Sequence, residues 1–492
     1  MLSRRCAMQL LKRFVVITAI SLCLMLCSAW GQDDSAVKPM EPQAAEQDNG
    51  AAATASDQQA GPTLTPDTNP PTGAKALGLG YLEGGENQLS GGLSFMEAGD
   101  TNPQLGSKGT SIGSWTTVSG QLALDRSWKS NTLELQYMAG GFIPNTKQAL
   151  GASQAHQLGV SDIIKAGRWS FMLSDDAVYA PEGGYGFGGL ASAAGQGIGL
   201  GSFTGLNPSL MNEQNAFLLG RRVSNTSAAQ LTYHLSAHSS VTLVGTYGLL
   251  HFMDAGFIDS NHVISEAGYN YAPTRHDTFY LNYAFGQFHF GGPTSAGLKS
   301  HSVTLGYTRR VTGRLLFDVA AGPQLISSKS WVSVPLLQLG PFVLFGLEKE
   351  TFRHISWTGY GGLKYSLGRT NMSLSYQRSA MGGSGLLAGA ETSGVQGSIG
   401  RTLGHRWDTN VMFGLSHSTG LGGAGALVYN TFYAGANVHR RLWRNERLEF
   451  NYQLQRQTTD VPCTAGIACG TDFVRHVFGV GFGWQFRPIR IG

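Results

Sequence analysis

The sequence predicts an all-β fold, a transmembrane antiparallel β-barrel of about eighteen strands (16–18), and three observations lead to this prediction. Charged residues make up only 13% of the chain, whereas soluble proteins carry about 25%. After residue 31 no apolar run is long enough for a membrane-spanning helix, which needs about 20 residues. From about residue 87, short segments alternate apolar residues with small or polar ones, as strands with one face on lipid do.

Residues 1–31 form the first predicted segment, a secretory signal peptide. A basic start precedes an apolar run from Phe14 to Ala29, and Ala29 and Gly31 place small residues at a cleavage site. The alternative is an uncleaved inner-membrane anchor. The basic residues are Arg4, Arg5, Lys12 and Arg13. They account for the excess of 35 Lys and Arg over 31 Asp and Glu in the whole chain, so the mature chain is neutral and no basic patch favours a nucleic-acid partner.

Residues 32–80 form the second predicted segment, a disordered acidic linker. This segment is rich in Pro, Ala and Gln and contains almost no large apolar residue, so it cannot bury a core of its own. It serves either as a passive linker or as a tether that contacts a periplasmic partner. Residues 81–492 are the predicted outer-membrane β-barrel.

Strands and turns follow one another regularly through the barrel segment. In 279–285, for example, Phe279, Leu281, Tyr283 and Phe285 alternate with Tyr280, Asn282 and Ala284, the period of a two-faced strand. Eight short turns are predicted near residues 128, 166, 237, 274, 311, 368, 404 and 443. With one further strand near 87–97 and another at 473–486, they give eighteen strands. The longest loops are expected at 181–213 and 323–352.

The alternation also predicts which residues face the lumen and which face lipid. The lumen-lining candidates are Glu134, Asn282, Asp318, Gln377, Asn410, Glu449 and Gln453. The lipid-facing candidates are Leu281, Phe317, Leu374, Phe413 and Phe450. Each lumen candidate either contributes to the selectivity of a pore or only solvates the wall.

The mature chain keeps two cysteines, Cys463 and Cys469, in a segment rich in Gly and Thr. A disulfide that closes a short loop is expected in an oxidising compartment. A metal site would need further ligands, and none stands near these two residues in the sequence.

The last strand of the sequence, Phe473 to Phe486, places aromatic residues at alternate positions. It is similar to the assembly signal of outer-membrane barrels, although here six residues follow Phe486. The ending Phe-Arg-Pro-Ile (486–489) and the repeated turns resemble a group of large, porin-like bacterial outer-membrane β-barrel proteins, some of which accompany exopolysaccharide export systems. The resemblance covers residues 87–492 and implies the barrel fold. It brings no catalytic or binding motif.

Candidate catalytic groups are sparse. His251 with Asp254, and His301 with Ser302, are the pairs that a barrel-embedded hydrolase could use, and neither has a third partner in the sequence. The glycine-rich segment 183–189 lacks the Lys and Ser or Thr of a phosphate-binding loop. No cofactor, metal or enzyme activity is therefore expected.

Residues 331–346 are too apolar for a solvated loop. They form either a constriction that folds into the lumen or an extended hairpin above the membrane.

A barrel of 16–18 strands leaves a channel unless loops fill it. The expected function is therefore passage of small solutes or exported glycan through an integral outer-membrane pore. The expected partners are outer-membrane lipid and, through the last strand, the barrel-assembly machinery. The alternatives are a structural or adhesive surface barrel and a barrel-embedded hydrolase.

Overall fold

The computed structural model describes residues 87–103, 112–146, 153–180, 221–291, 296–339, 342–383, 385–421, 427–460 and 472–491. The predicted signal peptide and linker, Cys463 and Cys469, and the glycine-rich segment 183–189 lie outside these residues.

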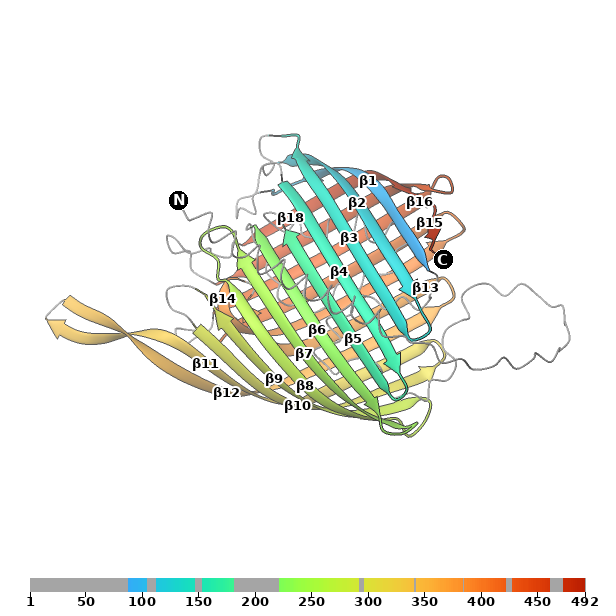
Figure 1. Ribbon diagram of the computed structural model, residues 1–492. Helices are drawn as coiled ribbons and strands as arrows, with labels where there is room; N and C mark the ends of the chain where they lie inside the picture. The colour runs from blue at the N-terminus through green and yellow to red at the C-terminus, as the bar shows by residue number, and fades with distance from the viewer. Residues whose placement is uncertain are drawn as a thin grey trace. The chain divides into compact units, whose positions relative to one another are not determined.

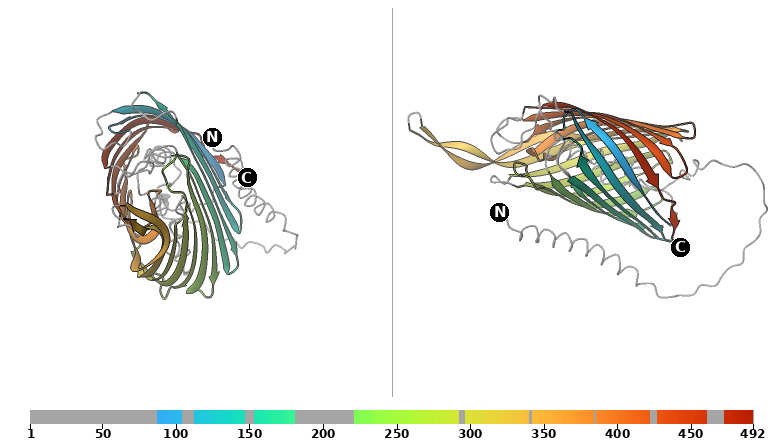
Figure 2. Two further views of the ribbon diagram at one scale, coloured as in Figure 1. Left: turned by 90° about the vertical axis from the view of Figure 1, so that its left-hand side faces the viewer. Right: turned by 90° about the horizontal axis from the view of Figure 1, so that it is seen from above.

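Eighteen antiparallel strands form a closed barrel, which confirms the predicted fold class and strand count (Figure 1). Each strand pairs with the next along the chain, and the last pairs with the first through Gly92↔Gln485 to Asp100↔Val477. The view along the barrel in Figure 2 shows the strands surrounding one interior. The strands are β1 (Gln88–Asp100), β2 (Gly113–Ser127), β3 (Asn131–Pro144), β4 (Ser153–Ala166), β5 (Trp169–Ala180), β6 (Arg222–His234), β7 (Ser239–Phe252), β8 (Ser260–Tyr271), β9 (Asp277–Phe290), β10 (Ala296–Thr312), β11 (Leu315–Leu339), β12 (Phe342–Leu367), β13 (Thr370–Gly383), β14 (Leu387–Leu403), β15 (Trp407–Gly420), β16 (Val428–Arg441), β17 (Glu446–Thr459) and β18 (Phe473–Gln485).

The eight predicted short turns all lie at one end of the barrel, which we call the short-turn end. Gly167 and Gly368 adopt φ of 59° and 53° there, a left-handed conformation that tight hairpins use and that glycine adopts without strain. The opposite end, which we call the long-loop end, carries the longer connections, although β11–β12 and β13–β14 are joined by only a few residues there. In outer-membrane barrels the short turns are periplasmic and the long loops extracellular.

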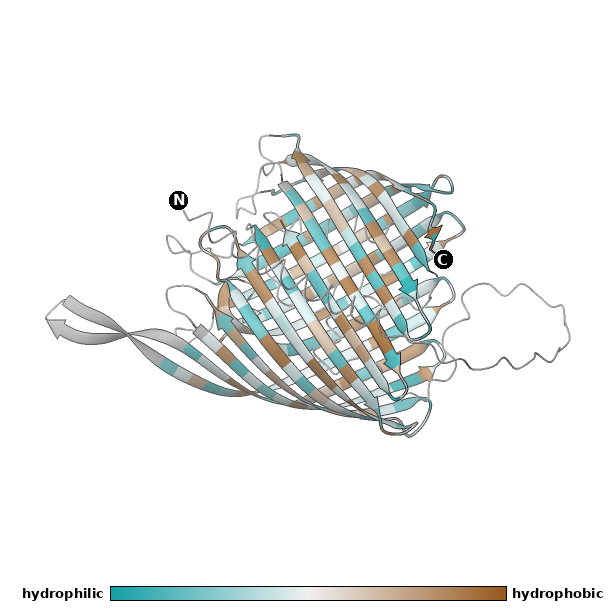
Figure 3. Cartoon of the chain, in the orientation of Figure 1, coloured by the Kyte–Doolittle hydropathy of each residue, from teal (hydrophilic) through white to brown (hydrophobic). Residues whose placement is uncertain are grey.

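The two faces of the wall differ in hydropathy, and Figure 3 shows hydrophobic and hydrophilic residues alternating along the strands. On β9, Leu281 is 51% exposed on the outer face, whereas its neighbour Asn282 is 2% exposed on the inner face. Large apolar side chains are exposed on the outside of most strands. A water-soluble protein does not expose so many, and in lipid only a closed barrel satisfies the backbone of β-strands.

Aromatic and basic side chains mark the short-turn end. Trp128 and Trp443 are exposed there, and the Arg126 guanidinium lies 4.9 Å from the centroid of the Trp128 ring. Arg440 lies 5.1 Å from the ring of Trp407 in the same way. This is the composition of the headgroup region of a membrane. In the described part of the chain, no helix is long and apolar enough to cross a membrane. The described strands therefore form a transmembrane β-barrel of the outer-membrane type.

The segment 331–346 belongs to an extended hairpin rather than to a fold into the lumen. Strands β11 and β12 pair from Leu315↔Tyr365 to Leu339↔Phe342, and Figure 1 shows this hairpin running out past the other strands. The expectation of a long loop at 323–352 was therefore wrong. The reason is that its apolar and β-branched residues continue the strand pairing beyond the wall instead of ending it.

The barrel closes between β18 and β1, and the end of the chain follows the same edge. After β18, the two residues of β19 (Ile489–Arg490) pair with Gln88 and Leu89 of β1. The outward residues of β18 include Phe478, Val480 and Phe482, each at least 41% exposed. The aromatic repeat of the last strand therefore faces lipid.

Candidate functional site

The seven lumen candidates are spread around the wall, and the structure does not bring them together into one site. Each lies on the face opposite to the exposed apolar residues of its strand. The outward candidates Leu281, Phe317, Leu374, Phe413 and Phe450 are between 37% and 51% exposed. The inward candidates are Glu134 on β3, Asn282 on β9, Asp318 on β11, Gln377 on β13, Asn410 on β15, and Glu449 and Gln453 on β17.

Two of these candidates are held by neighbouring strands in a polar network. The amide nitrogen of Asn282 donates to Glu266 Oε2 over 3.3 Å. Asp318 Oδ1 accepts hydrogen bonds from Tyr280 Oη at 2.9 Å and from Thr308 Oγ1 at 3.0 Å. Asn282 and Asp318 are both buried. Their polar groups therefore stabilise the wall.

The carboxylates of Glu134 and Glu449 differ in their surroundings. Glu134 faces Asp125 across the β2–β3 pair. Glu449 is buried and forms an ion pair with Arg447 on the same strand. A buried carboxylate needs such a partner to remain charged.

The other three candidates are only partly buried. Gln377 lies opposite Tyr360, and Asn410 lies opposite Asn437. Gln453 lies opposite Gly435 on β16. Of the seven candidates, these amides and Glu134 keep some accessible surface.

A buried ion pair at the closure of the barrel is a feature that the sequence analysis missed. Arg475 of β18 lies 2.6 Å from the carboxylate of Asp100 on β1, and both side chains are almost fully buried. Arg475 Nη1 also donates to Gln455 Oε1 over 3.2 Å. The available signal was an arginine at an inward position of the apolar last strand.

Towards the long-loop end the inner wall becomes apolar, which is unusual for the interior of a wide barrel. Phe252 at the end of β7, Phe288 and Phe290 of β9 and Leu298 of β10 all point inward and are at most 5% exposed. Ile326 of β11 joins them. These apolar side chains are covered by other residues of the protein.

The residues that cover this apolar wall come from the far end of the β13–β14 hairpin. We call residues 379–383 and 385–390 the inward hairpin. Gly385 has a φ of 82°, and its carbonyl accepts a hydrogen bond from the backbone nitrogen of Ile258 over 2.9 Å. A Cβ atom at Gly385 would lie 2.4 Å from the ring of Phe252. The inward hairpin therefore touches β7 and the β7–β8 loop directly.

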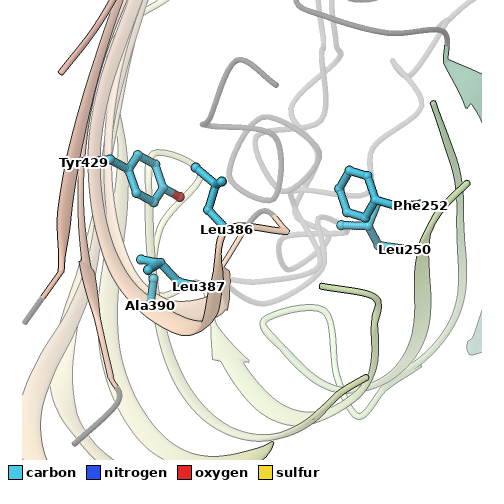
Figure 4. Packing of buried hydrophobic residues seen from close by; sticks show 6 residues of the cluster. All are labelled: Leu250, Phe252, Leu386, Leu387, Ala390 and Tyr429. Carbon is cyan, nitrogen blue, oxygen red and sulfur yellow. The ribbon is translucent and has the colours of Figure 1, made fainter. Parts of the chain in front are cut away.

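Two buried apolar clusters result, and we call them together the apolar constriction. In one, Leu386, Leu387 and Ala390 of the inward hairpin join Leu250, Phe252 and Tyr429. Figure 4 shows Leu387 and Ala390 beside Tyr429, with Leu386 pointing towards the side that carries Leu250 and Phe252. In the second cluster, Ala380 packs with Phe288, Phe290, Leu298 and Ile326. The inward hairpin thus narrows the interior near the long-loop end.

The loop that receives the inward hairpin is held in place by polar contacts. Arg221 donates to both carboxylate oxygens of Asp254, with its backbone nitrogen at 2.7 Å and Nη2 at 2.6 Å. The hydrogen bonds from the Arg221 side chain lower the pKa of Asp254 below its usual value of 3.8. His251 contacts Asp259 at 2.7 Å, so the sequence pairing of His251 with Asp254 is not formed. Asp259 also accepts from the backbone nitrogen of Phe252.

The remaining histidines contact aromatic side chains of neighbouring strands. His301 is bonded to Tyr283 Oη at 2.9 Å on the outer face, and Ser302, the next residue on β10, therefore points inward. His262 is buried with its ring 5.2 Å from that of Phe288. Among the described residues, no group of three or more His, Cys, Asp or Glu could hold a metal ion.

Among known proteins, only solved structures resemble this chain. No protein-family model and no curated protein matches the chain. The outer membrane protein OpdK from Pseudomonas aeruginosa matches 81% of this chain over 99% of its own, with 10% identity and a TM-score of 0.36. OccAB3 from Acinetobacter baumannii matches 81% over 99%, with 9% identity and a TM-score of 0.38. The siderophore receptor PirA from Pseudomonas aeruginosa matches 82% over 82%, with 8% identity and a TM-score of 0.37. Similarity at this level does not indicate which solute this chain binds.

Proposed function

We propose that the barrel is a channel for passive passage of small solutes across the outer membrane, and that the apolar constriction controls that passage. One observation carries the proposal: an apolar cluster, built by a hairpin that leaves the wall, interrupts an interior whose other inward side chains are largely polar. Hydrophobic constrictions in channels stop permeation by excluding water, and they open when their apolar parts separate.

The size of the barrel favours passage over a filled core. Eighteen strands spaced about 4.8 Å apart and tilted by about 40° give a backbone diameter of roughly 35 Å. Wall side chains alone cannot fill such an interior. A hydrated glycan chain would need polar groups along its whole path, and the apolar constriction offers none, so we favour small solutes over exported glycan.

Swelling of proteoliposomes in sugars of increasing size tests the proposal. Liposomes that contain the purified protein should swell in a pentose faster than protein-free liposomes, and the rate should fall steeply for a tetrasaccharide because the constriction is narrow. Swelling no faster than in protein-free liposomes for every sugar would rule out passage.

Display of the extended β11–β12 hairpin is a second candidate function. The hairpin continues well beyond the ends of the neighbouring strands, and a pore does not require it. Deletion of residues 331–346 separates the two functions. A channel should keep its permeability after the deletion, whereas a display protein should lose its attachment to surfaces and have no permeability to lose.

We also propose that the barrel-assembly machinery recognises β18. Its outward Phe478, Phe482 and Trp484 alternate with inward glycines, and β18 is the strand that must find β1 to close the barrel. Replacing Phe482 by Ser should lower the amount of heat-modifiable barrel in the outer membrane. An unchanged amount would count against this role.

A further inference from the structure

The ladder of hydrogen bonds around the barrel is incomplete between β12 and β13. These strands pair from Leu367↔Thr370 only as far as Gly359↔Arg378. Beyond that point β12 continues in its pairing with β11, and β13 continues into the inward hairpin in its pairing with β14. We call the parting of the two strands the seam.

Side chains, rather than backbone hydrogen bonds, hold the seam together. Thr358 Oγ1 donates to the carbonyl of Arg378 over 2.8 Å. Arg378 forms an ion pair with Glu391 at 2.8 Å, and Ser356 donates to the same carboxylate. Ser356 belongs to β12 and Glu391 to β14, so this contact links β12 to the β13–β14 hairpin across the seam. A few side-chain contacts separate at lower cost than a continuous ladder in lipid.

The seam lies within the lipid-facing part of the wall. Arg378 is the ninth residue of β13, which places it roughly 20 Å above the short-turn end for strands tilted by about 40°. The apolar band of such barrels is about 25 Å tall. On the outer face of β12, Trp357 at the seam and Ile355 beyond it are 47% and 76% exposed. Lipid chains of the outer leaflet therefore contact the seam.

Apolar surface continues directly behind the seam. Ala380, two residues beyond Arg378, packs into the cluster with Phe288, Phe290 and Leu298 on the inner wall. The polar contacts of Glu391 and Arg378 at the seam are thus all that separates the lipid outside from the apolar constriction.

The outer face beside the seam is hollowed and carries a cation. A cavity of about 450 Å³ is lined by outward residues of β13 to β17, among them Tyr376, Val395, Leu415 and Arg456. Arg456 is exposed and forms no ion pair with any residue that the structure describes. The cavity also has polar lining residues, among them His417 and Asn430, and its apolar side chains together with the charge of Arg456 suit a molecule with an apolar chain and an anionic head.

We propose that the seam is a lateral opening through which anionic amphipathic molecules with one apolar chain pass between the outer leaflet and the lumen. The inference rests on the proposed channel function and names a second class of solute for the same interior. Opening requires the inward hairpin to move away from β12, which breaks the contacts of Glu391 with Ser356. The ladder below Gly359 stays intact.

A cross-link across the seam tests this route. In a background with Cys463 and Cys469 replaced by Ser, the pair Ser356→Cys and Glu391→Cys is joined by a short bifunctional thiol reagent. The control pair, Lys364→Cys and Ser373→Cys, lies opposite one another in the intact ladder. Cells that lack their own fatty-acid channel are given a fluorescent dodecanoate as the amphipathic probe. Nitrocefin, cleaved by a periplasmic β-lactamase, reports axial passage of a hydrophilic solute.

The seam cross-link should reduce dodecanoate entry to the rate of cells without the protein, and nitrocefin entry should fall less, because the cross-link pins only the base of the inward hairpin. The control cross-link should change neither rate. Arg456→Gln should slow dodecanoate entry alone. If the seam cross-link slows neither probe, or slows both equally, the lateral opening is wrong. If nitrocefin entry never exceeds that of cells without the protein while dodecanoate entry depends on the seam, the lateral route stands and the axial channel fails.

Discussion

Replacing Leu386 by Ala should hold the channel open. Leu386 is 6% exposed in the apolar constriction, where it packs with Leu250, Phe252 and Tyr429. Deleting such a buried side chain removes about 2 kcal/mol of apolar contact. Because the contact exists only while the inward hairpin is docked, the closed state alone loses this energy. A loss of about 2 kcal/mol shifts the equilibrium between closed and open states by roughly 30-fold.

Single-channel recording in planar bilayers measures that shift as the fraction of time spent open. The barrel itself should remain intact, because its ladder does not depend on Leu386, and heat modifiability on a gel checks this. Leu281→Ala is the matched control, since it deletes the same atoms from the lipid-facing side of β9. The reasoning is refuted if Leu386→Ala leaves the open fraction unchanged, or if Leu281→Ala raises it equally.

Three further predictions concern the wall, the loop and the cysteines. Leu374→Lys must place a charge in hydrocarbon and should lower barrel stability by about 2–4 kcal/mol, whereas Gln377→Lys should not; equal urea midpoints for the two would contradict the assignment of faces. The pKa of Asp254 is lowered, so the contacts of its carboxylate stabilise the β7–β8 loop fully at a pH above 3.8, the usual pKa of the group. This stabilisation is lost as the pH falls through the lowered pKa. The protection factors of the amides in that loop, which are corrected for the intrinsic pH dependence of exchange, should therefore fall in acid, and in Asp254→Asn they should show no such pH dependence. Cys463 and Cys469 should form a disulfide whose removal costs little because the loop is short; free thiols in freshly isolated protein, seen by mass spectrometry, would oppose this.

The wall of the barrel could be predicted because its signals are local. In β9, Leu281 and Tyr283 alternate with Asn282, so a few residues are enough to show the two-residue repeat of a strand and to assign its two faces. Turns such as the one at Gly368 end each strand with residues that suit a tight hairpin. Every strand also pairs with its neighbours along the chain, so the order of the sheet followed from the order of the sequence.

The constriction could not be predicted, because it depends on contacts between distant strands. Residues 381–390, MGGSGLLAGA, look like any small, glycine-rich connection. Only the docking of Gly385 on Phe252 and Ile258 turns them into part of the interior. The segment that did look like a constriction, 331–346, forms the extended hairpin instead. Apolar composition alone does not tell a docked loop from a long strand.

The hydrogen-bond and ion-pair partners on the inner wall could not be predicted either, because they also lie on different strands. Asp100 and Arg475 lie 375 residues apart and meet only because the last strand closes on the first. Asn282 and Asp318 were placed on the inner face by their period, but their bonds to Glu266 and Tyr280 required the register between strands. The alternation in the sequence shows which face of the strand a residue lies on, whereas its partner depends on the register between neighbouring strands.

Thiol labelling in intact cells tests the central claim most directly, that a passage runs through this barrel and is narrowed at the long-loop end. Gln453→Cys places a thiol on the inner face of β17 at mid-strand, and Phe450→Cys places one on the outer face. With Cys463 and Cys469 replaced by Ser, a small water-soluble maleimide should modify the first variant and spare the second. A polymer-linked maleimide too large for the constriction should modify neither from outside. Equal labelling of both variants by the small reagent, or protection of both from it, would contradict the account.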